Sequence, residues 1–229
     1  SFEKELEALE QLCSRSVDGV VIVSHVFSEK NIRTDRFRSD NIPLVAIADV
    51  KDSGVCSLNF DIAVSMDELF EHLTDNGLRR IAFVDYSVYP GKYEAYRDST
   101  RKFGIKEEYY TDFADFADDY DRLVAQILQD LPEVIIAGSD WIGAELIHRF
   151  SAAGVAVPDQ LAVATIDGTV LSATYNPPLT AIRSDIPMLA KTAIDIIVER
   201  IKGNTDLITK TIPTKLLIRQ STQKKGQKK

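Results

Sequence analysis

The 229-residue sequence is poor in cysteine, in histidine and in long apolar runs. Its two cysteines, Cys13 and Cys56, allow at most one disulfide and lack metal-ligand spacing. Reduced thiols and a cytoplasmic protein are therefore expected. No apolar run is long enough for a membrane span, so no membrane partner is expected. The 27 Lys and Arg against 35 Asp and Glu give a net charge of −8, which argues against nucleic-acid binding by this chain alone.

The motifs of the common enzymes are also missing. No Gly-x-Gly-x-x-Gly or Gly-x-x-x-x-Gly-Lys follows a predicted strand, and there is no Gly-x-Ser-x-Gly. The three histidines, His25, His72 and His148, lie in different predicted elements without a partner at metal spacing. We therefore expect no cofactor and no metal, and an enzyme is the least favoured class of function.

Short apolar runs alternate with segments of helical periodicity along most of the chain. Strands are predicted at 17–23, 43–49, 80–84, 134–137, 161–166 and 211–219. Helices are predicted at 2–13, 64–76, 91–103, 119–131, 140–153 and 186–202. Strands without polar alternation are typical of sheets covered on both faces. The pattern predicts an α/β fold built from βαβ units, with parallel sheets and right-handed crossovers.

Polar residues at the ends of the predicted strands are candidates for ligand binding. Ligands of open parallel sheets bind at the carboxyl edge, where Asp49, Asp140 and Asp167 each follow or end an apolar run. For Asp140 the alternative is a helix N-cap, and for Asp167 it is a turn before Gly168. Carboxylates, a cation and an aromatic ring together suit a hydroxyl-rich small molecule. The candidate residues are Ser24, His25, Asp49, Lys92, Phe113, Ser139, Asp140, Trp141 and Asp167.

Several blocks follow one another in a characteristic order from about residue 1 to residue 222. They are Val17-Asp18-Gly19-Val20-Val21, Ile42-Pro43-Leu44-Val45, Gly77 before Arg80-Ile81-Ala82-Phe83-Val84, Ser139-Asp140, Gly154-Val155-Ala156-Val157-Pro158-Asp159, Asn176-Pro177-Pro178-Leu179-Thr180 and Arg219-Gln220-Ser221-Thr222. Each block alone is a weak signal. In combination they resemble the effector-binding domain of the LacI/GalR family of bacterial transcription regulators.

The resemblance implies a periplasmic-binding-protein-like fold of type I, in which two Rossmann-like subdomains with parallel sheets hold the effector between them. Residues 1–60 and 169–204 would form the N-terminal subdomain, and residues 61–168 and 205–222 the C-terminal one. Residues 223–229 would be a disordered basic tail. The family's DNA-binding headpiece, and the first strand and helix of its effector domain, would precede Ser1, so we expect a truncated N-terminal part.

The family's effector-gripping residues are carried over one at a time. Its Arg falls on Lys92, which cannot make the flat two-pronged contact of Arg, so the effector can differ from the common sugars. Its Asn-Asp pair falls on Ser139-Asp140, and Asp140 is the strongest candidate. Its Gly-Phe-Asp-Asp becomes Thr165-Ile166-Asp167-Gly168, which loses one carboxylate.

The resemblance also implies a function and partners. We expect the sensing domain of a transcriptional repressor, active as a homodimer, whose sugar-like effector controls binding to operator DNA through the missing headpiece. A solute-binding protein of a sugar transporter has the same fold and is the alternative. A signal peptide upstream of Ser1 would favour that alternative, whereas a helix-turn-helix or winged-helix headpiece would favour the regulator.

Overall fold

The computed structural model describes residues 2–15, 17–23, 41–48, 55–85, 90–110 and 117–223, and the chain divides into two compact units. Unit 1 comprises Ser1–Phe60 and Asp185–Ile212, and unit 2 comprises Asp61–Ser184 and Pro213–Lys229. The strands are hydrogen-bonded in the order β1-β2-β3-β9-β8-β7-β6-β4-β5. The strand β9 (Thr209–Leu217) contributes residues to both units.

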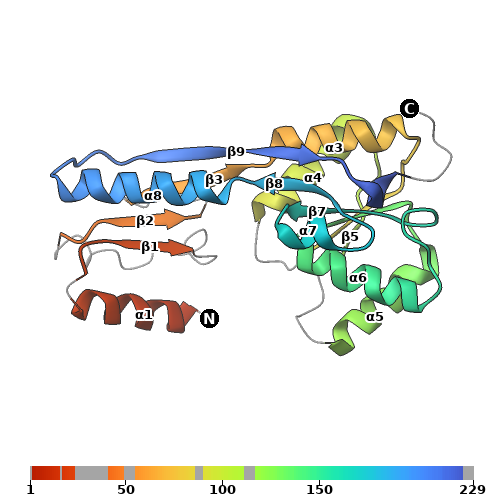
Figure 1. Ribbon diagram of the computed structural model, residues 1–229, viewed down its shortest axis with the longest axis horizontal. Coiled ribbons are helices and arrows are strands. Elements are labelled where there is room, and N and C mark those ends of the chain that lie inside the picture. The colour runs from red at the N-terminus through yellow and green to blue at the C-terminus, as the bar shows by residue number, and fades with distance from the viewer. Residues whose placement is uncertain are drawn as a thin grey trace. The chain divides into compact units, whose positions relative to one another are not determined.

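Unit 1 is a small sheet with a helix on each face. Its elements are α1 (Phe2–Ser14), β1 (Val20–Val23), β2 (Leu44–Ile47), β3 (Cys56–Asp61), α8 (Ile186–Ile201) and the first part of β9. β1, β2 and β3 are parallel. On β2, Leu44 and Ala46 pack in the cluster that contains Leu12 of α1, whereas Val45 packs with Leu189 of α8. Because alternate residues of a strand face opposite sides, this apolar run serves both helices (Figure 1).

Unit 2 is a larger sheet covered in the same way. Its helices are α3 (Ala63–Asp75), α4 (Pro90–Phe103), α5 (Ala117–Ile127), α6 (Asp140–Ala152) and α7 (Val170–Thr174), with the 3-10 turns η1 (Leu128–Asp130) and η2 (Gln220–Thr222). Its strands are β4 (Ile81–Val84), β5 (Tyr109–Tyr110), β6 (Val134–Ala137), β7 (Ala162–Asp167) and β8 (Thr180–Ser184), with the end of β9. β4 to β8 pair in parallel, and β9 runs antiparallel to β8.

The core of unit 2 has two layers, one on each side of the sheet. Val134 and Ile136 of β6 face the layer that holds Phe70 of α3 and Tyr96 of α4. Ile135 faces the opposite layer, formed with α5 and α6. All three β6 side chains are fully buried. This burial explains why the strand sequence shows no polar alternation.

The C-terminal end of the described chain is hydrogen-bonded to residues 178–180 of unit 2. The amide of Ser221 donates to the carbonyl of Pro178 (3.0 Å), and the amide of Thr180 donates to Oγ of Ser221 (2.8 Å). The guanidinium of Arg219 donates to the carbonyl of Leu179 (2.5 Å). Two of the sequence blocks that carried the resemblance are therefore bonded to each other, although Thr180 and Ser221 are 41 residues apart.

The predicted α/β alternation is confirmed, although the structure differs from the prediction in several places. β3, β5, β8 and α7 were not predicted, and β9 is antiparallel to β8, so the sheet is not wholly parallel. Residues 169–184, placed by the sequence in the N-terminal subdomain, belong to unit 2 because β8 pairs with β7. Residues 205–212 belong to unit 1, where Ile212 packs with Leu58 and Ile196.

None of the helices in the described part of the chain is long and apolar enough to cross a membrane.

Candidate functional site

Three adjacent parallel strands of unit 2 end at polar or small residues. β4 is followed by Asp85, β6 is followed by Gly138, and β7 ends at Asp167. β6 lies between β4 and β7 in the sheet, so these positions share its carboxyl edge. Open α/β sheets bind their ligands at this edge. It is the candidate site.

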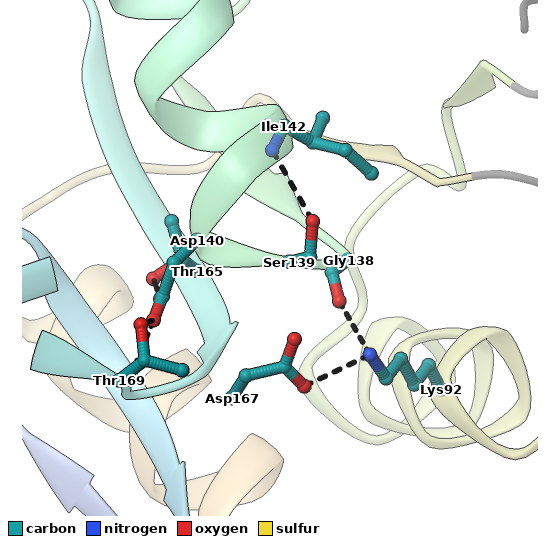
Figure 2. Close-up of polar contacts among 8 residues, drawn as sticks. All are labelled: Lys92, Gly138, Ser139, Asp140, Ile142, Thr165, Asp167 and Thr169. Carbon is teal, nitrogen blue, oxygen red and sulfur yellow. Dashed lines mark hydrogen bonds and ion pairs between the residues drawn. The ribbon is translucent and has the colours of Figure 1, made fainter. Parts of the chain in front are cut away.

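Lys92 on α4 joins two of the strand ends. Its Nζ donates to the carbonyl oxygen of Gly138 (2.6 Å) and forms an ion pair with Oδ1 of Asp167 (3.1 Å), as Figure 2 shows. The side chains of Lys92 and Asp167 are 14% and 38% exposed, so the pair is only partly open to solvent. The sequence placed both residues in the site without predicting their contact.

Asp167 has an unusual backbone conformation. Its φ is +97°, in the left-handed region that non-glycine residues rarely adopt, and Gly168 follows with φ +64°. Such a conformation costs on the order of 1–3 kcal/mol and persists only where the surroundings enforce it. The turn role considered for Asp167 is therefore present, and the turn directs its carboxylate to Lys92. Backbone strain of this kind clusters at ligand-binding sites.

Ser139 and Asp140 have different tasks at the start of α6. Ser139 is the N-cap, and its Oγ accepts a hydrogen bond from the amide of Ile142 (3.2 Å). The N-cap alternative for Asp140 is therefore wrong, since Asp140 is already the first residue of the helix.

The carboxylate of Asp140 ties together the ends of β6 and β7. Oδ1 accepts from the hydroxyl of Thr165 (2.6 Å), and Oδ2 accepts from both the amide (2.5 Å) and the hydroxyl (2.7 Å) of Thr169 (Figure 2). Asp140 is 3% exposed and Thr165 is fully buried. An ionised carboxylate can accept about four hydrogen bonds, so these three leave room for one more.

Asp85 is a site residue that the sequence analysis did not select. It is 3% exposed, and a Cβ atom built on Gly138 would overlap with its carboxylate. Asp85 therefore packs against the backbone at the end of β6, where no side chain fits. The signal was available, because Asp85 follows the strand Ile81–Val84 in the way that Asp167 ends β7.

Among the residues that the structure describes, Trp141 is the most exposed aromatic residue near this edge. It is the second residue of α6, beside Asp140, and 64% of its side chain is exposed. A large exposed ring next to polar groups is the arrangement that stacks on the apolar face of a sugar.

The structure thus brings Lys92, Ser139, Asp140 and Asp167 to one edge, and Trp141 follows Asp140 in the first turn of α6. Ser24, His25, Asp49 and Phe113 lie outside the described residues. Within the described ranges, no three His, Cys, Asp or Glu side chains gather as a metal site would require. The edge offers an ammonium donor and a partly exposed carboxylate acceptor.

An α/β chain with polar groups at the carboxyl edge of its sheet is typical of proteins that bind small molecules. Residues 70–222 match the profile of the periplasmic binding protein-like domain, which is more than half of the chain. The chain belongs to this family, as a periplasmic-binding-protein-like effector domain of the LacI-family transcriptional regulators. Its relatives are regulators, not enzymes.

Two curated relatives align with almost the whole chain. The HTH-type transcriptional repressor PurR of Glaesserella parasuis serovar 5 (strain SH0165) is 26% identical over 225 residues, which cover 94% of this chain and 65% of that protein. Catabolite control protein A of Priestia megaterium is 23% identical over 232 residues, covering 96% of this chain and 69% of its own length. The chain therefore spans about two thirds of the length of these relatives.

Solved structures share the fold at lower identity. A LacI-family regulator from Enterococcus faecium with bound ribose superimposes with a TM-score of 0.84 at 19% identity, covering 94% of this chain and 83% of that one. The complex of the regulator CelR with cellobiose gives a TM-score of 0.79 at 21% identity, covering 95% of this chain and 70% of the other. These likenesses establish the fold.

Proposed function

We propose that this chain is the effector-sensing domain of a transcriptional repressor that binds a small sugar or sugar derivative at the carboxyl edge of unit 2. The observation that carries the proposal is the convergence of Lys92, Ser139, Asp140 and Asp167 at the ends of neighbouring strands. Binding would control attachment to operator DNA by a headpiece outside these 229 residues.

The chemistry of the edge suits a ligand rich in hydroxyl groups. A sugar hydroxyl is both a donor and an acceptor, so it can accept from the ammonium of Lys92 and donate to the carboxylate of Asp167. The ring of Trp141 can stack on the apolar face of the same ligand. Solved structures of the same fold hold ribose, cellobiose, D-xylulofuranose and lactose, which supports this ligand class.

Asp140 is a positioning residue in the proposal. It holds Thr165 and Thr169 in place, and this fixes the turn that carries Asp167. Its carboxylate already accepts three hydrogen bonds and the residue is 3% exposed, so Lys92 and Asp167 make the main polar contacts with the ligand.

The rest of the proposal concerns the assembled regulator. We propose a homodimer in the cytoplasm, because DNA-binding repressors of this kind act at paired half-sites. The named relatives are transcriptional regulators, which favours this function over that of a transporter's solute-binding protein.

Calorimetric titration of the 229-residue chain with ribose, xylulose, cellobiose and lactose tests the sugar-binding part. At least one sugar should bind, and Lys92→Met should weaken it at least about tenfold, since a charge-assisted hydrogen bond contributes about 1.5–3 kcal/mol. Lys191→Met is the matched control, because Lys191 forms an exposed ion pair on α8 in unit 1. Equal affinities for the wild type and Lys92→Met would remove Lys92 from the site.

The regulatory part is tested on the natural full-length protein. Its retention of a DNA fragment from its own promoter should change when the sugar identified by calorimetry is added. Retention that does not depend on the sugar would contradict the sensor. Export of the natural protein across the membrane would instead support the solute-binding alternative.

A further inference from the structure

The positive charge of Lys92 is already countered inside unit 2. Its Nζ lies 3.1 Å from Asp167 Oδ1 and 2.6 Å from the Gly138 carbonyl oxygen. The Lys92 side chain is 14% exposed, whereas the surface pair Lys191–Asp195 has side chains that are 76% and 60% exposed. Solvent screens the Lys92–Asp167 pair less than such a surface pair. An incoming ligand therefore meets a neutralised cation.

The carboxylates in the described part of this edge are bonded or enclosed by the chain itself. The Asp140 carboxylate receives hydrogen bonds from uncharged donors of Thr165 and Thr169, and the Asp85 carboxylate packs on Gly138. Arg183 lies opposite Asp167 in the register of β7 and β8, and Lys215 lies opposite Arg183 in the register of β8 and β9. The described positions therefore carry three carboxylates and three cations, and Lys92 is the cation whose bond to one of these carboxylates is seen.

The N-terminus of α6 is also used in part by the chain itself. A helix N-terminus attracts anions through its unpaired amides and its dipole. Here the Oγ of Ser139 accepts the hydrogen bond from the amide of Ile142, and the carboxylate of Asp140 lies in the first turn. These side chains reduce the attraction of the helix N-terminus for a phosphate.

We propose, on the basis of the sugar-binding function above, that this edge selects an uncharged, hydroxyl-rich effector and that Asp167 is the residue that excludes phosphorylated and acidic sugars. A neutral hydroxyl can bridge Lys92 and Asp167 without separating them. A phosphate or carboxylate must compete with Asp167 for Lys92 and must approach two further carboxylates.

The test compares each neutral sugar with an anionic counterpart by calorimetry on the 229-residue chain. The pairs are ribose with ribose 5-phosphate, cellobiose with cellobionate, and lactose with lactobionate. The variant is Asp167→Asn, because Asn keeps the size of the side chain and tolerates the φ of +97°. The control is Asp195→Asn, which removes a carboxylate from an exposed lysine pair on α8.

The wild type and Asp195→Asn should bind a neutral sugar at least about tenfold more tightly than its anionic counterpart. In Asp167→Asn this ratio should shift by at least about tenfold towards the anionic sugar, and added salt should reduce the shift. Equal binding of both members of a pair by the wild type would overturn the inference, as would an unchanged ratio in Asp167→Asn.

Failure of the sugar-binding function gives a different pattern. If no neutral sugar binds the wild type but Asp167→Asn acquires an anionic one, the sugar proposal is wrong and the exclusion by Asp167 stands. If none of the six compounds binds either protein, both proposals are overturned.

Discussion

The carboxylate of Asp85 rests against the backbone of Gly138, so closely that a Cβ atom on residue 138 would overlap with it. The carbonyl oxygen of Gly138 also accepts the hydrogen bond from Lys92. Asp85, which follows β4, and Lys92, which lies on α4, thus both contact Gly138, the first residue after β6. Glycine at this position leaves room for the carboxylate of Asp85.

Replacing Gly138 with alanine should therefore disturb the packing of Asp85. We expect Gly138→Ala to lower the free energy of unfolding by about 1–3 kcal/mol, the usual cost of overpacking a buried site. Urea denaturation measures the change. Gly91→Ala is the control, because nothing lies within 4 Å of a Cβ at residue 91 and the residue is helical. That substitution should leave stability unchanged or raise it by up to about 1 kcal/mol.

Removing the carboxylate of Asp140 should cost stability before any effect on ligand binding. Asp140→Ala leaves the buried hydroxyl of Thr165 and the amide of Thr169 without their acceptor, and each such loss costs about 1–3 kcal/mol. Asp140→Asn should cost less, because its amide oxygen can still accept. A double-mutant cycle that combines Asp140→Ala with Thr165→Val should show a coupling energy of about 1 kcal/mol between the two residues. Additive effects of the two changes would contradict the bond to Thr165.

The fluorescence of Trp141 should report binding. It is the one tryptophan of the sequence, and its side chain is 64% exposed. A sugar that stacks on the ring would exclude water and shift the emission to shorter wavelength. The shift should saturate at the sugar concentration that saturates the calorimetric signal. Trp141→Ala should weaken binding and leave the urea midpoint unchanged, and unaltered affinity in this variant would place Trp141 outside the site.

The surroundings of His72 predict a dependence of stability on pH. Its Nε2 lies 3.0 Å from Oγ1 of Thr222, and Thr222 Oγ1 lies 2.7 Å from Oγ1 of Thr180. Burial lowers the pKa of His72 below its ordinary 6.5, and this outweighs the opposite effect of Asp75. The native state then binds fewer protons than the unfolded state. The contribution of neutral His72 is fully present above about pH 6.5 and is lost as pH falls through the lowered pKa.

Urea midpoints between pH 8 and pH 5 should show this loss. A His72→Gln variant should flatten the acid side of the profile, whereas His148→Gln should leave it unchanged because His148 is exposed on α6. Parallel profiles for the wild type and His72→Gln would show that His72 does not contribute.

Much of the fold was predictable because its strands are covered on both faces. Apolar runs such as Val134–Ala137 stand out against the helical periodicity that follows them. β3 was missed because Ser57 and Asn59 interrupt its apolar residues, and Ser57 is buried through a bond to Thr209 on β9. The hydrogen bond that compensates for burying Ser57 is made with Thr209, 152 positions away, so no local sequence pattern could indicate it.

The residues of the candidate site could be predicted from the sequence, but the bonds between them could not. The rule that strand ends bind ligands selected Asp140 and Asp167 with Lys92 as a nearby cation, and the resemblance placed Lys92 where the family has its Arg. The ion pair between Lys92 and Asp167 spans 75 residues and depends on the left-handed turn at Asp167. A positive φ is uncommon at any residue other than glycine, so the sequence did not predict the geometry that joins the pair.

The hydrogen bonds that Arg219 and Ser221 make with Leu179 and Thr180 bear on the folding of unit 2 during translation. The first strand of unit 2, β4, begins at Ile81, but Arg219 and Ser221 are synthesised only after all the strands of that unit. While the chain is growing, β8 lacks its antiparallel neighbour, and an open strand edge invites pairing with other chains. Nascent unit 2 should therefore need chaperone protection until synthesis has passed Thr222.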